Sequence, residues 1–129
     1  HRARHERRAA LARHERHAEA VRRAVKAWDL EILCAEPSEY SPVLTAVVMP
    51  DGHDADNLRA IILDKYNMSL GSGLGKVKGK VFRIGHLGDF NDLMLLGALS
   101  GVEMGFAVAG VPHKKGGVQA AIDFLTGNA

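Results

Sequence analysis

The run VLTAVVM at residues 43–49 constrains the fold more than any other segment. Four of its seven residues are β-branched, which favours an extended strand. Pro50 ends that strand, because proline has no N–H to donate to a neighbouring strand. Two more short apolar runs, LEILC at 30–34 and VFRIG at 81–85, also predict strands. The chain is therefore expected to build a sheet from strands of about five residues.

A long helix is predicted for residues 1–28. Apolar residues recur there at spacings of three, four and seven on one narrow face, namely Leu11, Ala18, Val21, Val25 and Trp28. The segment holds nine Arg and Lys against three Glu, so its charge is +6 and the rest of the chain carries −4. With no aromatic residues between the basic ones, this pattern favours a solvated helix face over a nucleic-acid or membrane surface.

Four histidines also lie in this first helix, at positions 1, 5, 14 and 17. His1 with His5, and His14 with His17, are each about one turn apart. However, no cysteine or acidic cluster completes a tetrahedral metal site. We interpret them as part of a solvated polar face and expect no metal.

Three further helices are predicted from their end signals. One follows Asp54 or Asp56 as the N-cap and ends near Asn67. The next is expected to begin at Asp89, with Asp92 at its N3 position, and to run to about residue 109. The last covers residues 116–125.

The order of elements is helix, strand, strand, helix, strand, strand, helix, helix. Residues 68–80 start extended and then become a glycine-rich loop. We therefore predict an α+β fold, in which a small mixed or antiparallel sheet carries helices on one face after a long N-terminal helix. The glycine-rich stretch GSGLGK fits neither a P-loop nor a dinucleotide-binding fingerprint, so a flexible loop is the favoured interpretation.

The helix after Asp89 contains Gly97, Gly101 and Gly105, four residues apart. Such small residues let a neighbouring element approach closely. The helix is apolar enough to suggest a membrane span, but Glu103 in its middle argues against one. We expect a helix packed tightly on the sheet or on another helix. The single cysteine, Cys34, excludes a disulfide framework and indicates a reducing, cytoplasmic compartment.

Arg83 is the candidate binding residue, because it lies inside an apolar strand. Alternation places Phe82 and Ile84 on one face, while Val81, Arg83 and Gly85 share the other. If the first pair meets the helices, the guanidinium lies on the opposite face with space beside Gly85. A planar, permanently charged group of this kind suits bidentate binding of a carboxylate. An internal ion pair with Asp or Glu is an equally good interpretation at this point.

Residues 68–105, together with AWDLEILC, YSPVLTAVVMP and GVPHKKGGVQAAIDFL, resemble the C-terminal small domain of class V (fold-type I) pyridoxal-phosphate aminotransferases. The resemblance is nearest to the serine–glyoxylate subgroup and spans nearly the whole chain. Its most specific element is the Arg-Ile-Gly-His-Leu-Gly sequence at 83–88. Asp29 stands where the family is expected to have glycine, which affects only a helix end.

The resemblance implies that Arg83 binds the α-carboxylate of an amino-acid or 2-oxo-acid substrate. It implies a parent enzyme, a homodimer, that moves an amino group from serine or alanine to glyoxylate with pyridoxal 5'-phosphate. Residues 1–28 would be a linker helix and 29–129 the small domain. The cofactor lysine would lie in a missing large domain, so this chain alone would bind no cofactor and be inactive. Neither nucleic acid nor membrane is expected as a partner.

A different class of function also fits the residues. The chain could be a stand-alone, non-catalytic domain that binds a small carboxylate at Arg83 or a protein through its sheet face.

Overall fold

A computed structural model of the chain describes residues 2–33, 44–85 and 91–127. Its four strands form one sheet in the order β1-β2-β4-β3, with β1 at Glu31–Ile32, β2 at Leu44–Val48, β3 at Gly71–Ser72 and β4 at Val81–Gly85. Each pairing among these strands is antiparallel. The α+β prediction is confirmed, and the described sheet is antiparallel rather than mixed. Cys34 and the loop predicted after it lie outside the described residues.

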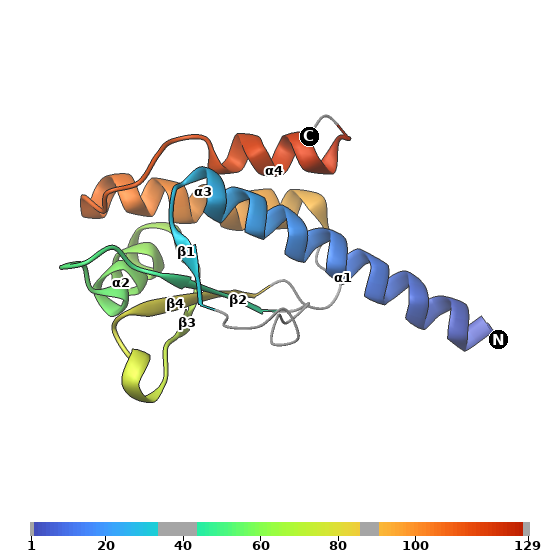
Figure 1. Cartoon of the computed structure of the whole chain (residues 1–129), viewed down its shortest axis with the longest axis horizontal. Coiled ribbons are helices and arrows are strands. Elements are labelled where there is room, and N and C mark those ends of the chain that lie inside the picture. Colours follow the sequence, from blue (N-terminus) through green and yellow to red (C-terminus); the bar gives the residue numbers. More distant parts are fainter. Residues whose placement is uncertain (1, 34–43, 86–90, 128–129) are drawn as a thin grey trace.

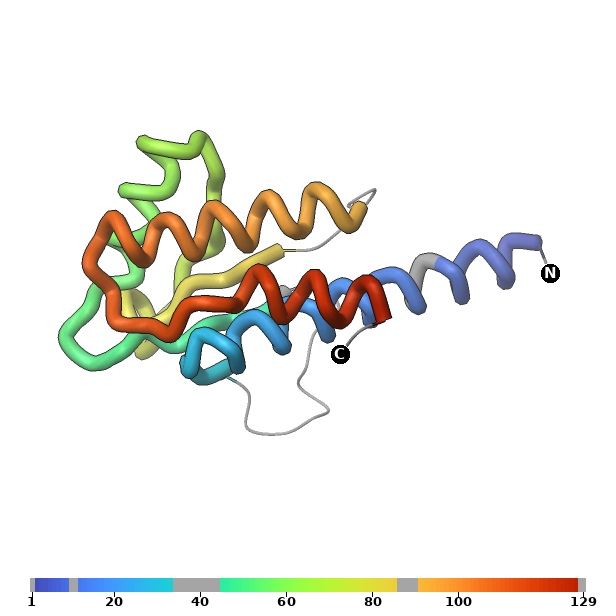
Figure 2. The backbone as a smooth tube through the Cα atoms, turned by 90° about the horizontal axis from the view of Figure 1, so that it is seen from above, coloured from blue at the N-terminus to red at the C-terminus, as the bar shows by residue number. Residues whose placement is uncertain are grey.

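The helices lie together on one side of this sheet (Figure 1). They are α1 (Arg2–Ala27), α2 (Ala55–Tyr66), α3 (Asp92–Ala109) and α4 (Gly117–Leu125), and a short 3-10 turn, η2, covers Gly75–Val77. Seen from above, α4 runs between α1 and α3 (Figure 2). The predicted order of elements is therefore the observed one.

The core fills the space between the sheet and the helices. Phe106 of α3 lies at its centre, and its ring makes edge-on contacts with Trp28 at 5.0 Å and with Phe82 at 6.1 Å between centroids. Trp28 ends the apolar face of α1, and Phe82 lies on the inner face of β4. All three are fully buried. This aromatic cluster joins α1, α3 and the sheet into one body.

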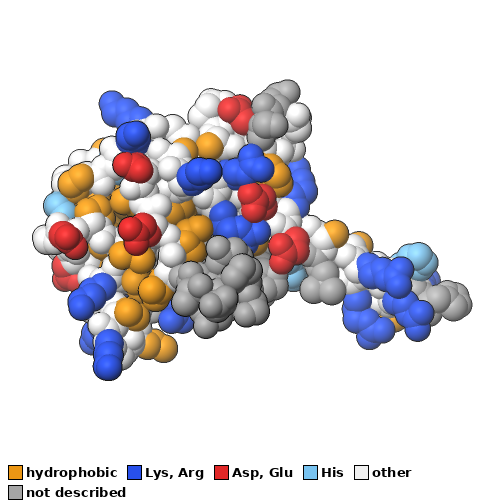
Figure 3. Space-filling view, in the orientation of Figure 1, with side chains coloured by type: hydrophobic (Ala, Val, Ile, Leu, Met, Phe, Trp, Pro, Cys, Tyr) orange, Lys and Arg blue, Asp and Glu red, His pale blue; other side chains and the backbone are white. Residues whose placement is uncertain are grey.

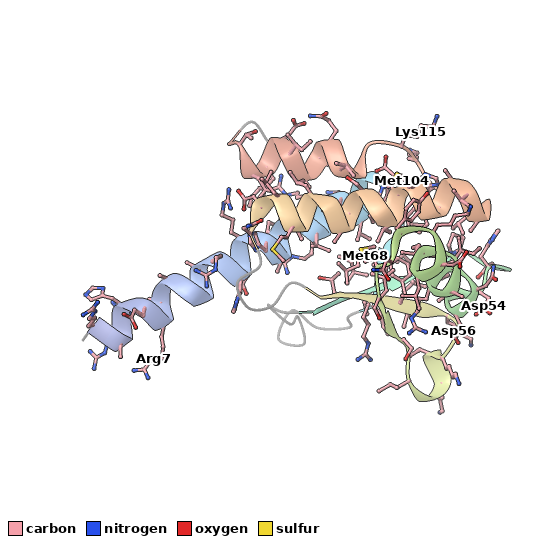
Figure 4. All side chains as sticks on the ribbon, turned by 180° about the vertical axis from the view of Figure 1, so that it is seen from behind. Arg7, Asp54, Asp56, Met68, Met104 and Lys115 are labelled. Atoms are coloured by element: carbon pink, nitrogen blue, oxygen red, sulfur yellow. The ribbon has the colours of Figure 1, made fainter. Side chains whose placement is uncertain are left out.

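Only the second part of α1 belongs to this body. Ala18, Val21, Val25 and Trp28 are fully buried, as the apolar face predicts. Residues 2–9 are exposed and project away from the rest of the molecule (Figure 3). Arg7 lies on this projecting part (Figure 4). The interpretation of the basic segment as a solvated face fits these residues.

For His17 that interpretation is wrong. Its side chain is only 1% exposed, and its Nε2 lies 2.9 Å from Oδ1 of Asp92. The same carboxylate accepts two hydrogen bonds from Arg16, at 2.6 and 3.0 Å. The histidine is buried because it lies where α1 meets the first residue of α3, a contact between residues 75 apart that helix periodicity cannot reveal.

Capping residues set the ends of α2 as predicted. Asp54 accepts a hydrogen bond from the backbone N–H of Asp56, and Asn67 takes a left-handed conformation at the other end. Asp29, just after α1, is also left-handed, with φ 62°, at the position where glycine was expected.

The predicted start of α3 is wrong. Asn91 caps the helix by accepting the backbone N–H of Met94 at 2.8 Å, and Asp92 is the first helical residue rather than N3. Asp89, the expected cap, lies outside the described residues. Asn and Asp are about equally good caps, so composition alone could not choose between these positions.

Two of the three spaced glycines in α3 serve close packing, as expected. A methyl group on Gly101 would lie 2.8 Å from the Cε of Met68, and one on Gly105 would lie 2.5 Å from Ile62. Gly97 has open space beside it. By length and composition α3 could cross a membrane, but a single such helix is weak support for a span. Here it packs between α2 and α4.

Candidate functional site

Arg83 lies on the sheet face that the helices leave uncovered. Its neighbours Phe82 and Ile84 are 0% and 1% exposed and belong to the core, so alternation along β4 turns Arg83 to the other side. The side chain is half-buried. The strand therefore presents a guanidinium from a rigid part of the sheet, as the alternation predicts.

The residues beside Arg83 are small. Ala46 of β2 is its cross-strand partner on one side, and Gly71 of β3 is its partner on the other. The row continues to Leu33, whose N–H donates to the carbonyl of Ala46 at 2.9 Å. Gly85, two residues further along β4, is exposed. Among the described residues, Arg83 is therefore flanked by small residues on both neighbouring strands.

Arg83 is the only Lys or Arg in the four described strands. Within the described ranges it forms no hydrogen bond and no ion pair. Glu31 shares its sheet face but lies on β1, two strands away. Two interpretations were open for Arg83, binding of an external carboxylate and an internal ion pair. The part of the chain that is described contains no partner for the ion pair.

Other arginines are used differently. Arg59 donates to the carbonyl of Leu70 at 2.8 Å and pairs with Asp56, which ties α2 to the segment before β3. Arg16 holds Asp92, and its hydrogen bonds are the main cause of the lowered pKa of that carboxyl. These side chains fasten elements together, whereas the guanidinium of Arg83 has no such contact within residues 2–33, 44–85 and 91–127.

Sequence reasoning missed that Gly71 lies in a strand beside Arg83. The glycine run was interpreted as a flexible loop after an extended start, yet Gly71 and Ser72 form β3 and pair with β4. A strand of two residues shows no alternation pattern. The usable signal was the extended start predicted for residues 68–80.

No family model matches the chain. Among curated proteins, serine–glyoxylate aminotransferases are similar: that of Hyphomicrobium methylovorum is 44% identical over 120 residues, covering 92% of this chain and 30% of the relative. That of Arabidopsis thaliana is 48% identical over 117 residues, covering 89% and 29%. An L-aspartate–glyoxylate aminotransferase of Paracoccus denitrificans is 46% identical over 112 residues, covering 86% and 28%.

Solved structures agree with these relatives. Ureidoglycine–glyoxylate aminotransferase from Bacillus subtilis matches with a TM-score of 0.82 at 29% identity, over 89% of this chain and 30% of that one. Pyridoxamine–pyruvate aminotransferase from Mesorhizobium loti also gives 0.82, at 35% identity, over 92% and 31%.

By sequence and by fold, the chain therefore aligns with one part of class V aminotransferases. It spans about 30% of the length of the relatives it matches, so it corresponds to one segment of such an enzyme. Several of those relatives are serine–glyoxylate aminotransferases.

Proposed function

We propose that this chain is the C-terminal small domain of an aminotransferase that transfers an amino group from serine, or alanine, to glyoxylate. The observation that carries the proposal is Arg83, a half-buried guanidinium on an open sheet face with no anionic partner among the described residues. In this proposal Arg83 binds the carboxylate that both the amino donor and the 2-oxo acid carry. Residues 1–28 link this domain to the large domain of the parent.

Arg83 acts by orientation. Two parallel N–H donors of a guanidinium fix both oxygens of a carboxylate, and therefore the direction of the neighbouring Cα–H bond. Holding a reacting bond in one direction contributes several powers of ten in rate. A strand in the middle of a sheet is a suitable support, because β4 is paired on both sides.

Pyridoxal phosphate, which the family implies, does not fit this chain alone. All seven lysines are exposed and lie on helices or turns, outside the four strands: Lys26, Lys65, Lys76, Lys78, Lys80, Lys114 and Lys115. A lysine that carries this cofactor is usually desolvated or lies beside a perturbing charge. We therefore assign the cofactor to the proposed parent enzyme, a homodimer.

The test is substitution of Arg83 in the full-length enzyme. Arg83→Ala is expected to raise KM for both serine and glyoxylate by about a hundredfold, because a charge-assisted bidentate contact is lost. Cofactor binding, followed by absorbance, should not change. Arg83→Lys should restore little, since lysine lacks the planar fork.

Arg7→Ala is the matched control, because Arg7 lies on the exposed, projecting part of α1. Unchanged KM values in Arg83→Ala would refute the proposed role. An intact mass near 13.9 kDa for the native protein would favour the alternative, a stand-alone carboxylate-binding or interaction domain.

A further inference from the structure

Gly71 makes an unusually close approach to Arg83. A methyl group placed on its Cα would lie 3.0 Å from the Cβ of Arg83, 3.7 Å from its carbonyl oxygen and 3.8 Å from its Cδ. Contacts of 3.4–4 Å are ordinary for such atoms. The nearest of these atoms is fixed to the backbone of β4, so it cannot move aside as the end of a flexible side chain could.

The backbone does not explain this glycine. Gly71 is not among the glycines with positive φ, so alanine could adopt its conformation without strain. What glycine provides at this position is space. The space lies beside Cβ of Arg83, the first atom of the side chain that carries the candidate guanidinium.

The contact lies on the functional side of the sheet. Gly71 and Arg83 are direct partners across β3 and β4, so both face away from the core. Contacts at Cβ and Cδ mean that the aliphatic stem of Arg83 lies along β3. The strand therefore forms one wall for the stem, and Ala46 lies on the other side.

We propose that Gly71 is a positioning residue, whose missing side chain sets the direction in which Arg83 presents its guanidinium to a carboxylate. This inference rests on the proposed function of Arg83. Adding a methyl group must shift the stem by several tenths of an ångström at Cβ, and the guanidinium lies four bonds further out. A bidentate contact depends on direction as well as distance, so such a shift weakens it.

The experiment is a double-mutant cycle in the full-length enzyme, with KM and kcat for serine and glyoxylate as readouts. Gly71→Ala is expected to raise KM for both substrates about tenfold and to lower kcat as well, because a substrate held in the wrong direction reacts more slowly even at saturation. In an Arg83→Ala background the same change should have no further effect on KM or kcat, because the guanidinium that it redirects is absent.

Gly97→Ala is the control, because it adds the same methyl group in α3 with no atom within 4 Å. If Arg83→Ala has no effect, the proposed function fails. If Arg83→Ala impairs binding but Gly71→Ala does not, the inference alone fails. An effect of Gly71→Ala that persists in the Arg83→Ala background, or loss of folded protein, would also overturn it, because the space would then serve strand pairing instead.

Discussion

Replacing Glu103 should destabilise the fold more than replacing any exposed carboxylate. Oε1 of Glu103 accepts the indole N–H of the fully buried Trp28 at 2.6 Å and the backbone N–H of Val118, at the start of α4, at 3.2 Å. One carboxylate therefore joins the end of α1, the middle of α3 and the beginning of α4. Gly117 lies so close to the indole that no side chain would fit there.

The size of the effect follows from these contacts. In Glu103→Ala the indole donor stays buried without its acceptor, which costs about 1–3 kcal/mol. Loss of an anion at the N-terminus of α4 adds about 0.3–1 kcal/mol. We expect a total of about 2–3 kcal/mol, which corresponds to a fall in Tm of roughly 10 °C for a chain of this length. Glu103→Gln keeps an acceptor and should lose about half as much.

The assay is urea denaturation of the 129-residue chain followed by fluorescence, because Trp28 is its only tryptophan and reports directly on this contact. Glu6→Ala is the control. Among the described residues, Glu6 pairs only with Arg2 on the projecting helix, and its side chain is 69% exposed, so a change near zero is expected. A loss below about 0.5 kcal/mol in Glu103→Ala would refute this account of the core.

Three further outcomes are expected. Burial raises the pKa of Glu103, but hydrogen bonds from Trp28 and from the backbone amides at the start of α4 lower it by a larger amount. The folded pKa therefore lies below the ordinary value of 4.5. The stability from its charged form is thus present above that value and lost as pH falls below it, and Glu103→Gln should flatten the acid limb of a pH–stability curve. Asp92→Asn should destabilise the fold at neutral pH, because hydrogen bonds from Arg16 are the main cause of the lowered folded pKa of Asp92. The difference from the unsubstituted chain should shrink as the pH falls below 3.8 and vanish only below the lowered folded pKa; equal stability at neutral pH would contradict this. Gly105→Ala should lower the free energy of unfolding by about 1–3 kcal/mol, because the added methyl group overpacks against Ile62. Gly97→Ala should leave that free energy unchanged or raise it by up to about 1 kcal/mol. Urea denaturation measures both.

Local patterns predicted the sheet and the direction of its candidate residue. A strand alternates with period two wherever one face is buried, so Phe82 and Ile84 in the core determine the side on which Arg83 lies. The same kind of local rule located the ends of α2, because Asp54 and Asn67 act within one turn of the backbone they cap.

Contacts between segments far apart in the sequence could not be predicted from such local patterns. Asp92 binds Arg16 and His17 across 76 and 75 residues, so a residue that looked like part of a capping pattern is instead half of a helix–helix contact. The space that Gly71 leaves for Arg83 depends on the register between β3 and β4, which a two-residue strand does not encode on its own.

The two faces of the sheet differ: the inner face packs against the core, and the outer face holds Arg83. Substitutions on the two faces should therefore affect different properties. The inner face holds Val47, Phe82 and Ile84, whose burial stabilises the fold, while the cross-strand neighbours of Arg83 on the outer face, Ala46 and Gly71, are small and half-buried or exposed. Removing the Arg83 side chain takes little apolar area out of the core, so Arg83→Ala should change Tm far less than Glu103→Ala. Glu103→Ala, in turn, leaves the outer face intact and should leave KM unchanged wherever the enzyme stays folded. If the same variant lowered both Tm and substrate affinity strongly, the separation of stability from binding argued from these two faces would be wrong.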